Sequence, residues 1–313
     1  MKSLSELTDF YYKNLFPTLE KLEADRKSLR AKIIIIAIVY TLVFLAIGSI
    51  MSDGYDILLF VYAGIGMLLY KFLVKDYTKE FKQNIIKPLI HAIDNKLHYL
   101  STSHVSEHLF NRSDLFSHPD RFNGNDLVRG EIEDIKIQFS DVHAEKKHRD
   151  SKGRTSWSTI FQGLFIVADF NKNFKGHTVV LPDTAQNMFG DLIGNWLQSK
   201  NMARNELIKM DDPKFEKEFV VYSTDQVEAR YILSHSLMKK LLHFKHKSKH
   251  PLHISFAQNH IHMAIDYDED LFEPAIFSSL LDYKVAMAYV QTLHLAIGIV
   301  QELKLNEKLW SKT

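Results

Sequence analysis

The hydrophobic positions of the chain begin with two long apolar runs. Residues 33–52 form a run of twenty residues without a charge, and a second run covers 57–70 and continues through 72–74. A helix needs about 20 predominantly apolar residues to cross the hydrocarbon core of a bilayer. The segment SDGYD joins the two runs, and Asp-Gly is a strong turn signal. The pattern therefore predicts a transmembrane helical hairpin over residues 33–75.

Charges around the hairpin predict its orientation. The joining segment has two acidic residues and no basic one, whereas both outer flanks are basic. Short basic flanks stay in the cytoplasm, so we expect a bacterial inner-membrane protein with both termini cytoplasmic. Gly64 and Gly66 are expected to let the two helices approach each other. The flanking basic residues are Arg26, Lys27, Arg30, Lys32, Lys71, Lys75, Lys79 and Lys82.

Two other interpretations of the apolar runs are disfavoured. A signal peptide could be cleaved after Ala46-Ile47-Gly48, but residues 1–32 precede the apolar run, whereas whole signal peptides have about 15–30 residues. A buried hairpin of a soluble core is disfavoured because the first uncharged stretch is too long for an ordinary core helix.

Hydrophobic periodicity divides the remainder of the chain into helices and strands. Residues 1–32 are expected to form a cytoplasmic amphipathic helix with an interruption at Pro17, and residues 76–313 a cytoplasmic domain. Strands seldom alternate one for one with helices, so the fold class is α+β with a mostly antiparallel sheet. The expected helices are 76–100 with a kink at Pro88, 105–110, 184–198, one opening at Asp225, 234–247 and 276–303. The expected strands are 130–144, 160–170, 176–181, 207–210, 219–222, 252–257 and 261–265, with a hairpin loop over 145–156.

Composition narrows the chemistry. The chain has 39 basic and 38 acidic residues and no cysteine. The absence of cysteine excludes disulfides, thiolate metal sites and cysteine nucleophiles. Because no domain-wide basic field exists, nucleic-acid binding is not expected. No glycine-rich phosphate loop and no nucleophile elbow is present. The basic hairpin loop carries Trp157; it could touch anionic headgroups if it faced the membrane, and is otherwise a solvated tip.

Two clusters could carry chemistry, and each has a simpler structural explanation. Asp225 and Glu228 have the spacing of a capping box, which accounts for them without an acid–base role, and Arg230 is expected to pair with a nearby carboxylate. Imidazoles at three- and four-residue spacing share a helix face and could bind zinc. However, lysines are interspersed among them, and cations suit a solvated helix end better than a metal site. The candidate metal ligands are His243, His246 and His250.

Two segments resemble a known family. They are FQGLFIVADFNKNFKGHTVVLPD at 161–183 and DPKFEKEFVVYSTDQVEARYILSHSLMKKLL at 212–242. Together with the hairpin they resemble the bacterial membrane-protein family catalogued as domain of unknown function 3137, over residues 126–274. The chain departs from the family pattern at His235, where proline would open the next helix. The resemblance implies the architecture and no activity.

The leading functional hypothesis is a membrane-anchored cytoplasmic interaction or scaffold module. It has an anchor and a folded domain but no recognisable catalytic residues, and no cofactor is expected. Its expected partners are the lipid bilayer, through residues 33–75, and another protein or a second copy, through the final helix. The alternative is an enzyme or a ligand or metal sensor whose Asp, Glu, His and Arg side chains come from separate elements.

Overall fold

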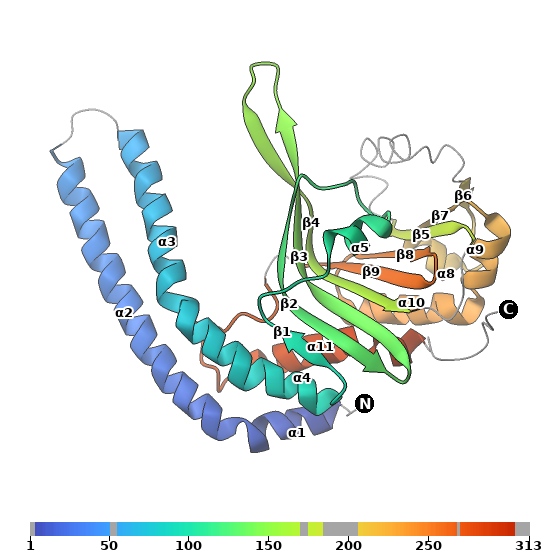
Figure 1. The fold of residues 1–313 in the computed structure, drawn as a ribbon, viewed down its shortest axis with the longest axis horizontal. Coiled ribbons are helices and arrows are strands. Elements are labelled where there is room, and N and C mark those ends of the chain that lie inside the picture. Colours follow the sequence, from blue (N-terminus) through green and yellow to red (C-terminus); the bar gives the residue numbers. More distant parts are fainter. Residues whose placement is uncertain (1–3, 51–54, 170–174, 184–205, 268–269, 304–313) are drawn as a thin grey trace. The chain divides into compact units, whose positions relative to one another are not determined.

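The computed structural model describes residues 4–50, 55–169, 175–183, 206–267 and 270–303 (Figure 1). These residues form two compact units. A helical unit combines residues 2–92 with 272–291, and a sheet unit combines residues 93–271 with 292–313. Residues 93–271 of the sheet unit are therefore inserted into the sequence of the helical unit. The expected helix over 184–198 lies outside the described residues.

The first helices of the helical unit follow the hydrophobic pattern. Helix α1 (Leu4–Asn14) and helix α2 (Phe16–Gly48) are separated at Leu15, with Pro17 in the first turn of α2. Proline is tolerated there because the first backbone N–H groups of a helix have no intrahelical partner. The expected interruption is thus the start of a new helix, which continues without a break into the apolar run.

Helix α3 (Tyr55–Phe81) returns beside α2 and forms the expected antiparallel hairpin. The rings of Tyr40 and Tyr62 stack with centroids 4.6 Å apart, and the Tyr40 hydroxyl donates to the Tyr62 carbonyl at 2.8 Å. A Cβ atom at Gly66 would lie 3.4 Å from the Tyr40 ring, whereas one at Gly64 would meet no described atom within 4 Å. Close approach therefore involves Gly66, and the expectation for Gly64 was wrong.

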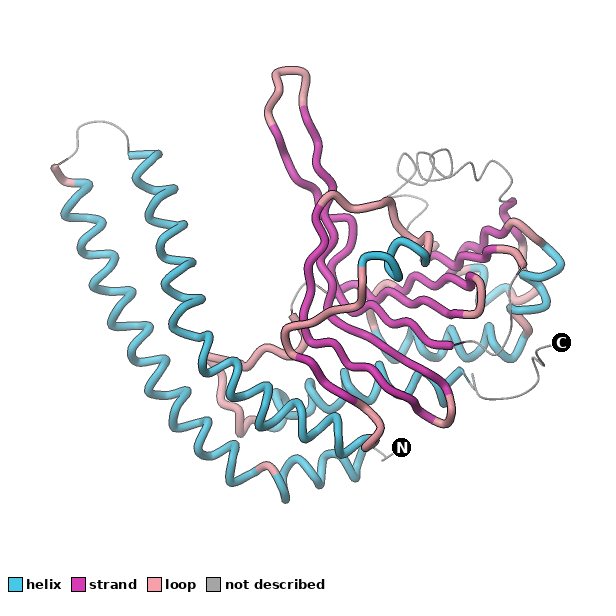
Figure 2. Tube along the Cα trace, in the orientation of Figure 1, coloured by secondary structure: helices cyan, strands magenta, loops and turns pink. Residues whose placement is uncertain are grey.

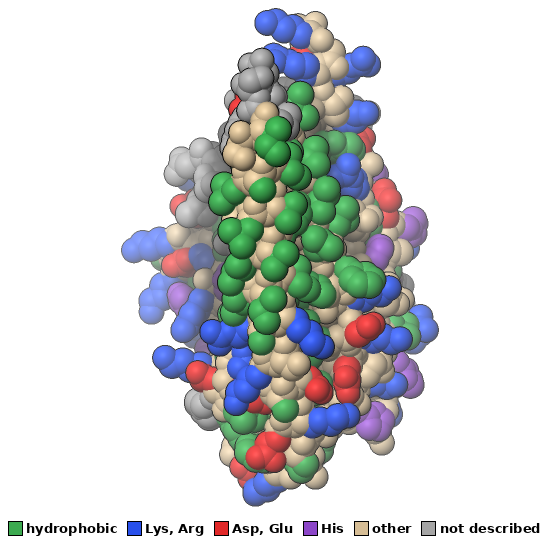
Figure 3. All heavy atoms as spheres, turned by 90° about the vertical axis from the view of Figure 1, so that its left-hand side faces the viewer, with side chains coloured by type: hydrophobic (Ala, Val, Ile, Leu, Met, Phe, Trp, Pro, Cys, Tyr) green, Lys and Arg blue, Asp and Glu red, His purple; other side chains and the backbone are tan. Residues whose placement is uncertain are grey.

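Helices α2 and α3 are long and apolar enough to cross a membrane. Their large hydrophobic side chains are exposed over most of the apolar runs, as the band of hydrophobic atoms in Figure 3 shows. Exposed isoleucine, leucine and phenylalanine on two neighbouring helices suit a hydrocarbon environment rather than water.

The expected helix over 76–100 was correct only for its first part. Helix α3 passes into a π-helical turn (Lys82–Ile86) and then into α4 (Lys87–Ile93). Proline lacks a backbone donor, and the π turn directly before Pro88 accommodates that loss. The helix then ends because the Asp94 carboxylate accepts a hydrogen bond from the Lys96 backbone N–H at 2.9 Å. This local bond competes with the helical pattern.

A buried ion pair holds the helical unit together. The Arg26 guanidinium donates two hydrogen bonds to the Glu23 carboxylate, at 2.7 and 2.8 Å, and a third to the Ile276 carbonyl at 2.7 Å. Glu23 also accepts a hydrogen bond from the Leu280 N–H at 3.0 Å. Both charged side chains are almost fully buried. The pair therefore fixes the segment before α11 (Tyr283–Leu303) against α2.

Among the described residues, nine strands form a single sheet in the order β1-β2-β3-β4-β9-β8-β5-β7-β6, and every neighbouring pair is antiparallel. Figure 2 shows the strands of this sheet in magenta. The predicted α+β class is confirmed. The strands are β1 (His98–Leu100), β2 (Arg121–Ile132), β3 (Ile135–Arg149), β4 (Thr155–Asp169), β5 (His177–Pro182), β6 (Glu206–Ile208), β7 (Phe219–Ser223), β8 (Leu252–Ala257) and β9 (His260–Asp266). The helices of this unit are α5 (Glu107–Arg112), α8 (Pro213–Glu216), α9 (Gln226–Ile232) and α10 (His235–Ser248).

The expected strand over 130–144 was wrong, because its residues belong to two strands. Strand β2 ends at Ile132, strand β3 begins at Ile135, and these two residues pair directly. The turn residues Glu133 and Asp134 have φ values of 49° and 66°. A two-residue hairpin turn requires positive φ at both positions, which Asn-Gly and Asp-Gly signal more strongly than Glu-Asp.

Other boundaries also differ from the expectation. The hairpin loop expected over 145–156 is limited to 150–154, because strands β3 and β4 continue into it. Helix α5 begins at Glu107 rather than at 105, with Ser106 as its N-cap. Helix α11 begins at Tyr283 rather than at 276, after a segment without regular structure.

Aromatic side chains form the centre of the sheet unit. Phe110 of α5 packs on Phe165 of β4, with ring centroids 5.1 Å apart, and Phe116 stacks on Phe161 at 5.0 Å. Helix α5 therefore covers one face of β4, and Val167 on the same face belongs to this core. Successive residues of a strand alternate between the two faces, so Asp169 also lies on this face.

Replacing Arg26 with methionine tests the buried pair. We expect Arg26→Met to leave the Glu23 carboxylate buried without its cation and to destabilise the helical unit by about 3–5 kcal/mol. Thermal unfolding of the full-length protein in detergent micelles would measure this loss. Lys27→Met is the control, because Lys27 is exposed and its ammonium lies 3.9 Å from Glu23. Equal stability of Arg26→Met and wild type would contradict the structural role of the pair.

Candidate functional site

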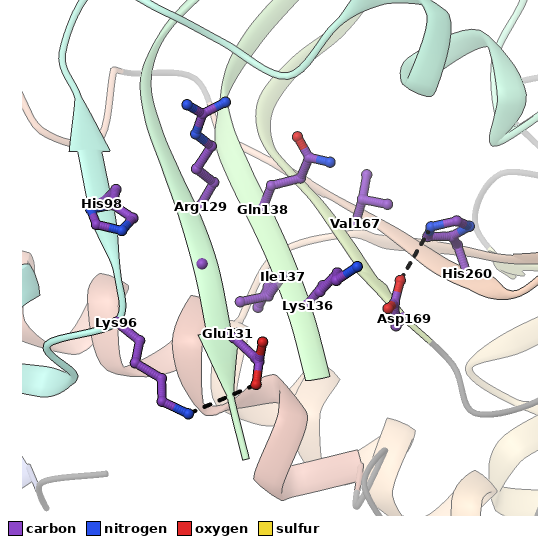
Figure 4. Close-up of a pocket in the computed structure, with 11 residues that line it drawn as sticks. Lys96, His98, Arg129, Glu131, Lys136, Ile137, Gln138, Val167, Asp169 and His260 are labelled. Atoms are coloured by element: carbon purple, nitrogen blue, oxygen red, sulfur yellow. Dashed lines mark ion pairs between the residues drawn. The ribbon is translucent and has the colours of Figure 1, made fainter. Parts of the chain in front are cut away.

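A polar groove of about 670 Å³ lies on the sheet unit across strands β1 to β4 and β9 (Figure 4). Most of its lining side chains are charged or can form hydrogen bonds. The lining residues are Lys96, His98, Arg129, Gly130, Glu131, Lys136, Ile137, Gln138, Val167, Asp169 and His260.

The strand register places these side chains beside one another. Side chains directly opposite on neighbouring antiparallel strands lie about 5 Å apart at Cβ, so the members of each register pair are neighbours. Five strands contribute one row across the sheet, and the next residues along the strands contribute two further pairs. The row runs His98, Arg129, Gln138, Val167 and His262, and the pairs are Glu131 with Lys136 and Asp169 with His260.

The charges in the groove are only partly neutralised. The Lys96 ammonium lies 3.8 Å from the Glu131 carboxylate, and the His260 imidazole lies 3.3 Å from Asp169. Arg129 and Lys136 have no ion-pair partner among the described residues. In Figure 4, Arg129 lies beside Gln138, and Lys136 lies between Glu131 and Asp169. The groove therefore offers a guanidinium, an amide and an ammonium to an acidic group.

The pKa values of two histidines of β9, His260 and His262, are lowered from that of an ordinary histidine. Burial lowers the pKa of His260, although the nearby Asp169 carboxylate raises it. Burial lowers the pKa of His262 to about 3, and the positive charges of His260, His177 and Arg112 act in the same direction. Both imidazoles are therefore favoured as neutral groups near pH 7.

His262 also contacts a serine. Its Nδ1 atom lies 3.3 Å from the Ser255 hydroxyl, on the neighbouring strand β8. Serine and histidine at this distance suggest a nucleophile with its base. However, Ser255 is completely buried and His262 is 2% exposed. A substrate could not reach the hydroxyl in this conformation, so the contact satisfies two buried polar groups.

The cluster around Asp225 has a structural role. Asp225 caps α9, because its carboxylate accepts hydrogen bonds from the Val227 and Glu228 backbone N–H groups at 2.9 and 3.0 Å. The Arg230 guanidinium lies 3.7 Å from the exposed Asp211 carboxylate, which agrees with the expected pairing.

Glu228 does not complete the expected capping box. Its carboxylate instead accepts hydrogen bonds from the Lys175 and Gly176 backbone N–H groups at 3.1 and 2.6 Å, which joins α9 to the start of β5. The Asp225 N–H, which a capping box would use, donates to the Ser223 hydroxyl. The contact from Glu228 is long-range and leaves no signal in local spacing.

The candidate metal ligands do not lie in one constellation. His243 and His246 are exposed on α10, whereas His250 follows that helix and packs its ring 4.2 Å from the Tyr267 ring. Within the described ranges, no group of three or more His, Cys, Asp or Glu residues is placed to hold a metal ion. His253, from the same sequence segment, is buried with its Nε2 atom 3.3 Å from Asp266.

The groove residues were not identified from the sequence. Arg129 and Glu131, like Lys136 and Gln138, alternate with apolar residues, which is also the pattern of a solvated strand face. Only the pairing of five strands shows that these side chains meet. The sheet arrangement and its helices define the class of this protein as an α+β protein with an N-terminal pair of long apolar helices.

Comparison with known families identifies a match over part of the chain. Residues 159–305 match the family model described as protein of unknown function (DUF3137). The resemblance stated from the sequence is confirmed where it overlaps this match, over residues 159–274. The matched segment begins within strand β4 and continues through β9 and helix α11.

Other comparisons give only distant likeness. A solved structure, the crystal structure of the mycobacterial trehalose monomycolate transport factor A (TtfA), is 13% identical to this chain. The comparison covers 70% of this chain and 94% of that chain, with a TM-score of 0.34, which is too low to assign a shared fold or function. A comparison with curated proteins finds no match.

The lowered pKa of His262 predicts a loss of stability in mild acid. The unfolded chain binds a proton at this histidine below about pH 6.5, whereas the folded chain does so only near pH 3. Protonation therefore favours unfolding as the pH falls between these values, by at most about 1.4 kcal/mol per pH unit. We expect His262→Gln to weaken the fall in the unfolding temperature between pH 6.5 and 5.

Thermal unfolding of the full-length protein in detergent micelles would measure this effect. His246→Gln is the matched control, since His246 is exposed on α10 and should leave the pH dependence unchanged. The same pH dependence in wild type and His262→Gln would show that His262 is not the group responsible.

Proposed function

We propose that the chain is a two-pass protein of the bacterial inner membrane, with both termini in the cytoplasm. Helices α2 and α3 support the anchoring by their length and composition. Two of the eight flanking basic residues, Arg26 and Lys82, are buried in ion pairs of the helical unit. The other flanking lysines and Arg30 favour a cytoplasmic position for both flanks of the hairpin, because the positive-inside preference depends on basic residues near the membrane.

Cysteine labelling tests this topology without background, because the chain has no cysteine. Ser49→Cys lies at the loop end of α2, and Ser28→Cys lies within α2 in the basic segment that precedes the apolar run. Both serines are exposed. We expect a membrane-impermeant maleimide to label Ser49→Cys in intact spheroplasts and Ser28→Cys only after lysis. The reverse pattern would invert the topology, and equal labelling of both positions before lysis would contradict a membrane-spanning hairpin.

We also propose that the sheet unit is a non-catalytic binding module whose groove receives an acidic group, a carboxylate or a phosphate. The observation that supports this role is the excess of cationic over acidic side chains in the lining, with Lys96, Arg129 and Lys136 against Glu131 and Asp169. Arg129 is suited to planar acidic groups, because a guanidinium can donate two parallel hydrogen bonds to them. The Asp169–His260 and Lys96–Glu131 pairs border this position and would limit the ligand to one that leaves them undisturbed.

An enzyme is the second candidate, and the Asp169–His260 pair favours it. A neutral imidazole held by a carboxylate can act as a general base. The described lining of the groove contains no serine, threonine or tyrosine that this imidazole could activate. A bound ligand that mass spectrometry recovers chemically unchanged would support the binding module, whereas a converted one would support the enzyme.

Binding to full-length protein in non-ionic detergent micelles tests the groove. The probes are citrate and inorganic pyrophosphate, measured by isothermal titration calorimetry. We expect wild type to bind at least one of them and Arg129→Ala to weaken that binding about 10- to 100-fold, because a hydrogen bond to a charged group contributes about 1.5–3 kcal/mol.

Lys239→Ala, on the exposed face of α10, is the matched control and should bind as wild type does. Saturable binding that Arg129→Ala leaves unchanged would place the anion elsewhere. No saturable binding of either probe to wild type would contradict a groove for a small acidic group.

A further inference from the structure

Strands β3 and β4 extend beyond the rest of the sheet. The pairing of β2 with β3 ends at Arg121 opposite Glu145, and the pairing of β4 with β9 ends at Gly163. Residues 146–158 therefore form a two-stranded ribbon, which projects from the sheet in Figure 2. An isolated pair of strands is marginally stable in water and buries little apolar surface. Packing against neighbouring strands therefore does not explain the ribbon.

The tip of the ribbon is ordered by its own hydrogen bonds. The Asp150 carboxylate accepts from the Lys152 and Arg154 backbone N–H groups at 2.9 and 2.8 Å, and from the Arg154 guanidinium at 2.9 Å. Gly153 has a φ value of 78°, which favours glycine. The tip thus holds a defined shape while its side chains stay exposed.

One face of the ribbon combines cations with an aromatic ring. Register places Lys147 opposite Trp157 and Arg149 opposite Thr155. Both pairs lie on the same face, because side chains two residues apart on a strand share a face. The Arg121 guanidinium lies 4.0 Å from the centroid of the Trp157 ring and also pairs with Glu145 at 2.9 Å. Trp157 remains 38% exposed. An amphipathic ring surrounded by cations resembles the side chains that occupy a membrane–water interface.

The ribbon carries a local charge that the chain as a whole lacks. Residues 145–159 contain five basic and two acidic residues, whereas the whole chain has a net charge of +1. Its remaining side chains include three serines and two threonines. Their hydroxyl groups can donate hydrogen bonds to phosphate oxygens. Basic segments of this kind are attracted to anionic lipid surfaces.

We propose that this ribbon is a second membrane contact, which binds the anionic phosphate headgroups of phospholipids. The inference rests on the proposed membrane anchoring, because the two apolar helices would hold the chain at a bilayer. A lipid surface fits better than nucleic acid or an acidic protein, because Trp157 supplies an interfacial ring and the rest of the chain supplies no basic field. The tip residues Lys152 and Arg154 extend the basic face toward the headgroups.

A single cysteine reports this contact in the full-length protein. Ser151→Cys at the tip carries an environment-sensitive fluorophore, and Ser236→Cys on α10 is the matched control, since both serines are exposed. Each protein is reconstituted into vesicles of phosphatidylcholine alone or mixed with phosphatidylglycerol. We expect the emission from position 151 to shift to shorter wavelength and rise only when phosphatidylglycerol is present. The emission from position 236 should be the same in both vesicles.

Charge variants separate electrostatic contact from simple proximity. Lys147→Gln, Arg149→Gln and Lys152→Gln in combination should abolish the response at position 151, as should high salt, which screens exposed charges. The charge-preserving combination Lys147→Arg, Arg149→Lys and Lys152→Arg should retain it. A water-like emission at position 151 in both vesicles would overturn the proposal, as would a response that the glutamine variants keep.

Flotation of the same vesicles in high salt distinguishes failure of the proposed ribbon contact from failure of the proposed membrane anchoring. Protein that floats but shows no response at position 151 would contradict the ribbon contact and leave the anchor standing. Protein that does not float would contradict the proposed anchoring itself.

Discussion

The Glu23–Arg26 pair is the interaction on which the helical unit depends. It joins residues about 250 positions apart in the sequence, because Arg26 bonds to the Ile276 carbonyl and Glu23 to the Leu280 N–H. A buried charge is costly unless its partner and its hydrogen bonds are complete. Here the two charges satisfy each other and also satisfy two backbone groups of a segment without regular structure. That segment can therefore be buried without leaving its backbone groups unpaired.

A second buried charge, at the π turn, is also neutralised by a residue that is distant in the sequence. The Lys82 ammonium is buried and pairs with the Glu273 carboxylate, while the Tyr289 hydroxyl donates to the Glu273 carbonyl at 2.7 Å. Residues from both ends of the chain thus form one unit around the base of the apolar helices. Helix α2 continues without a break from the Glu23–Arg26 pair into its apolar half. A substitution that breaks this pair therefore affects the same helix that would enter the membrane.

The elements found from the sequence were those specified by local signals. The apolar runs, the cap at Asp225, the start of α10 near Ser234 and the strands of the β8–β9 hairpin depend on residues a few positions apart. The errors came from competing interactions. An Asx turn at Asp94 ended a helix whose apolar spacing continued, and Glu-Asp formed a turn that glycine usually forms. Glu228 and the buried Glu23–Arg26 pair depend on long-range contacts, which spacing along the chain does not reveal.

The turn between β2 and β3 determines which side chains line the groove. Glu133 and Asp134 both take positive φ, so Ile132 pairs with Ile135 and the register of β2 with β3 follows. That register places Arg129 beside Gln138 and Glu131 beside Lys136. A shift by one residue would turn these side chains to the opposite face and bring apolar residues into the groove. The charge pattern of the groove is therefore a consequence of the turn and not of the charged residues alone.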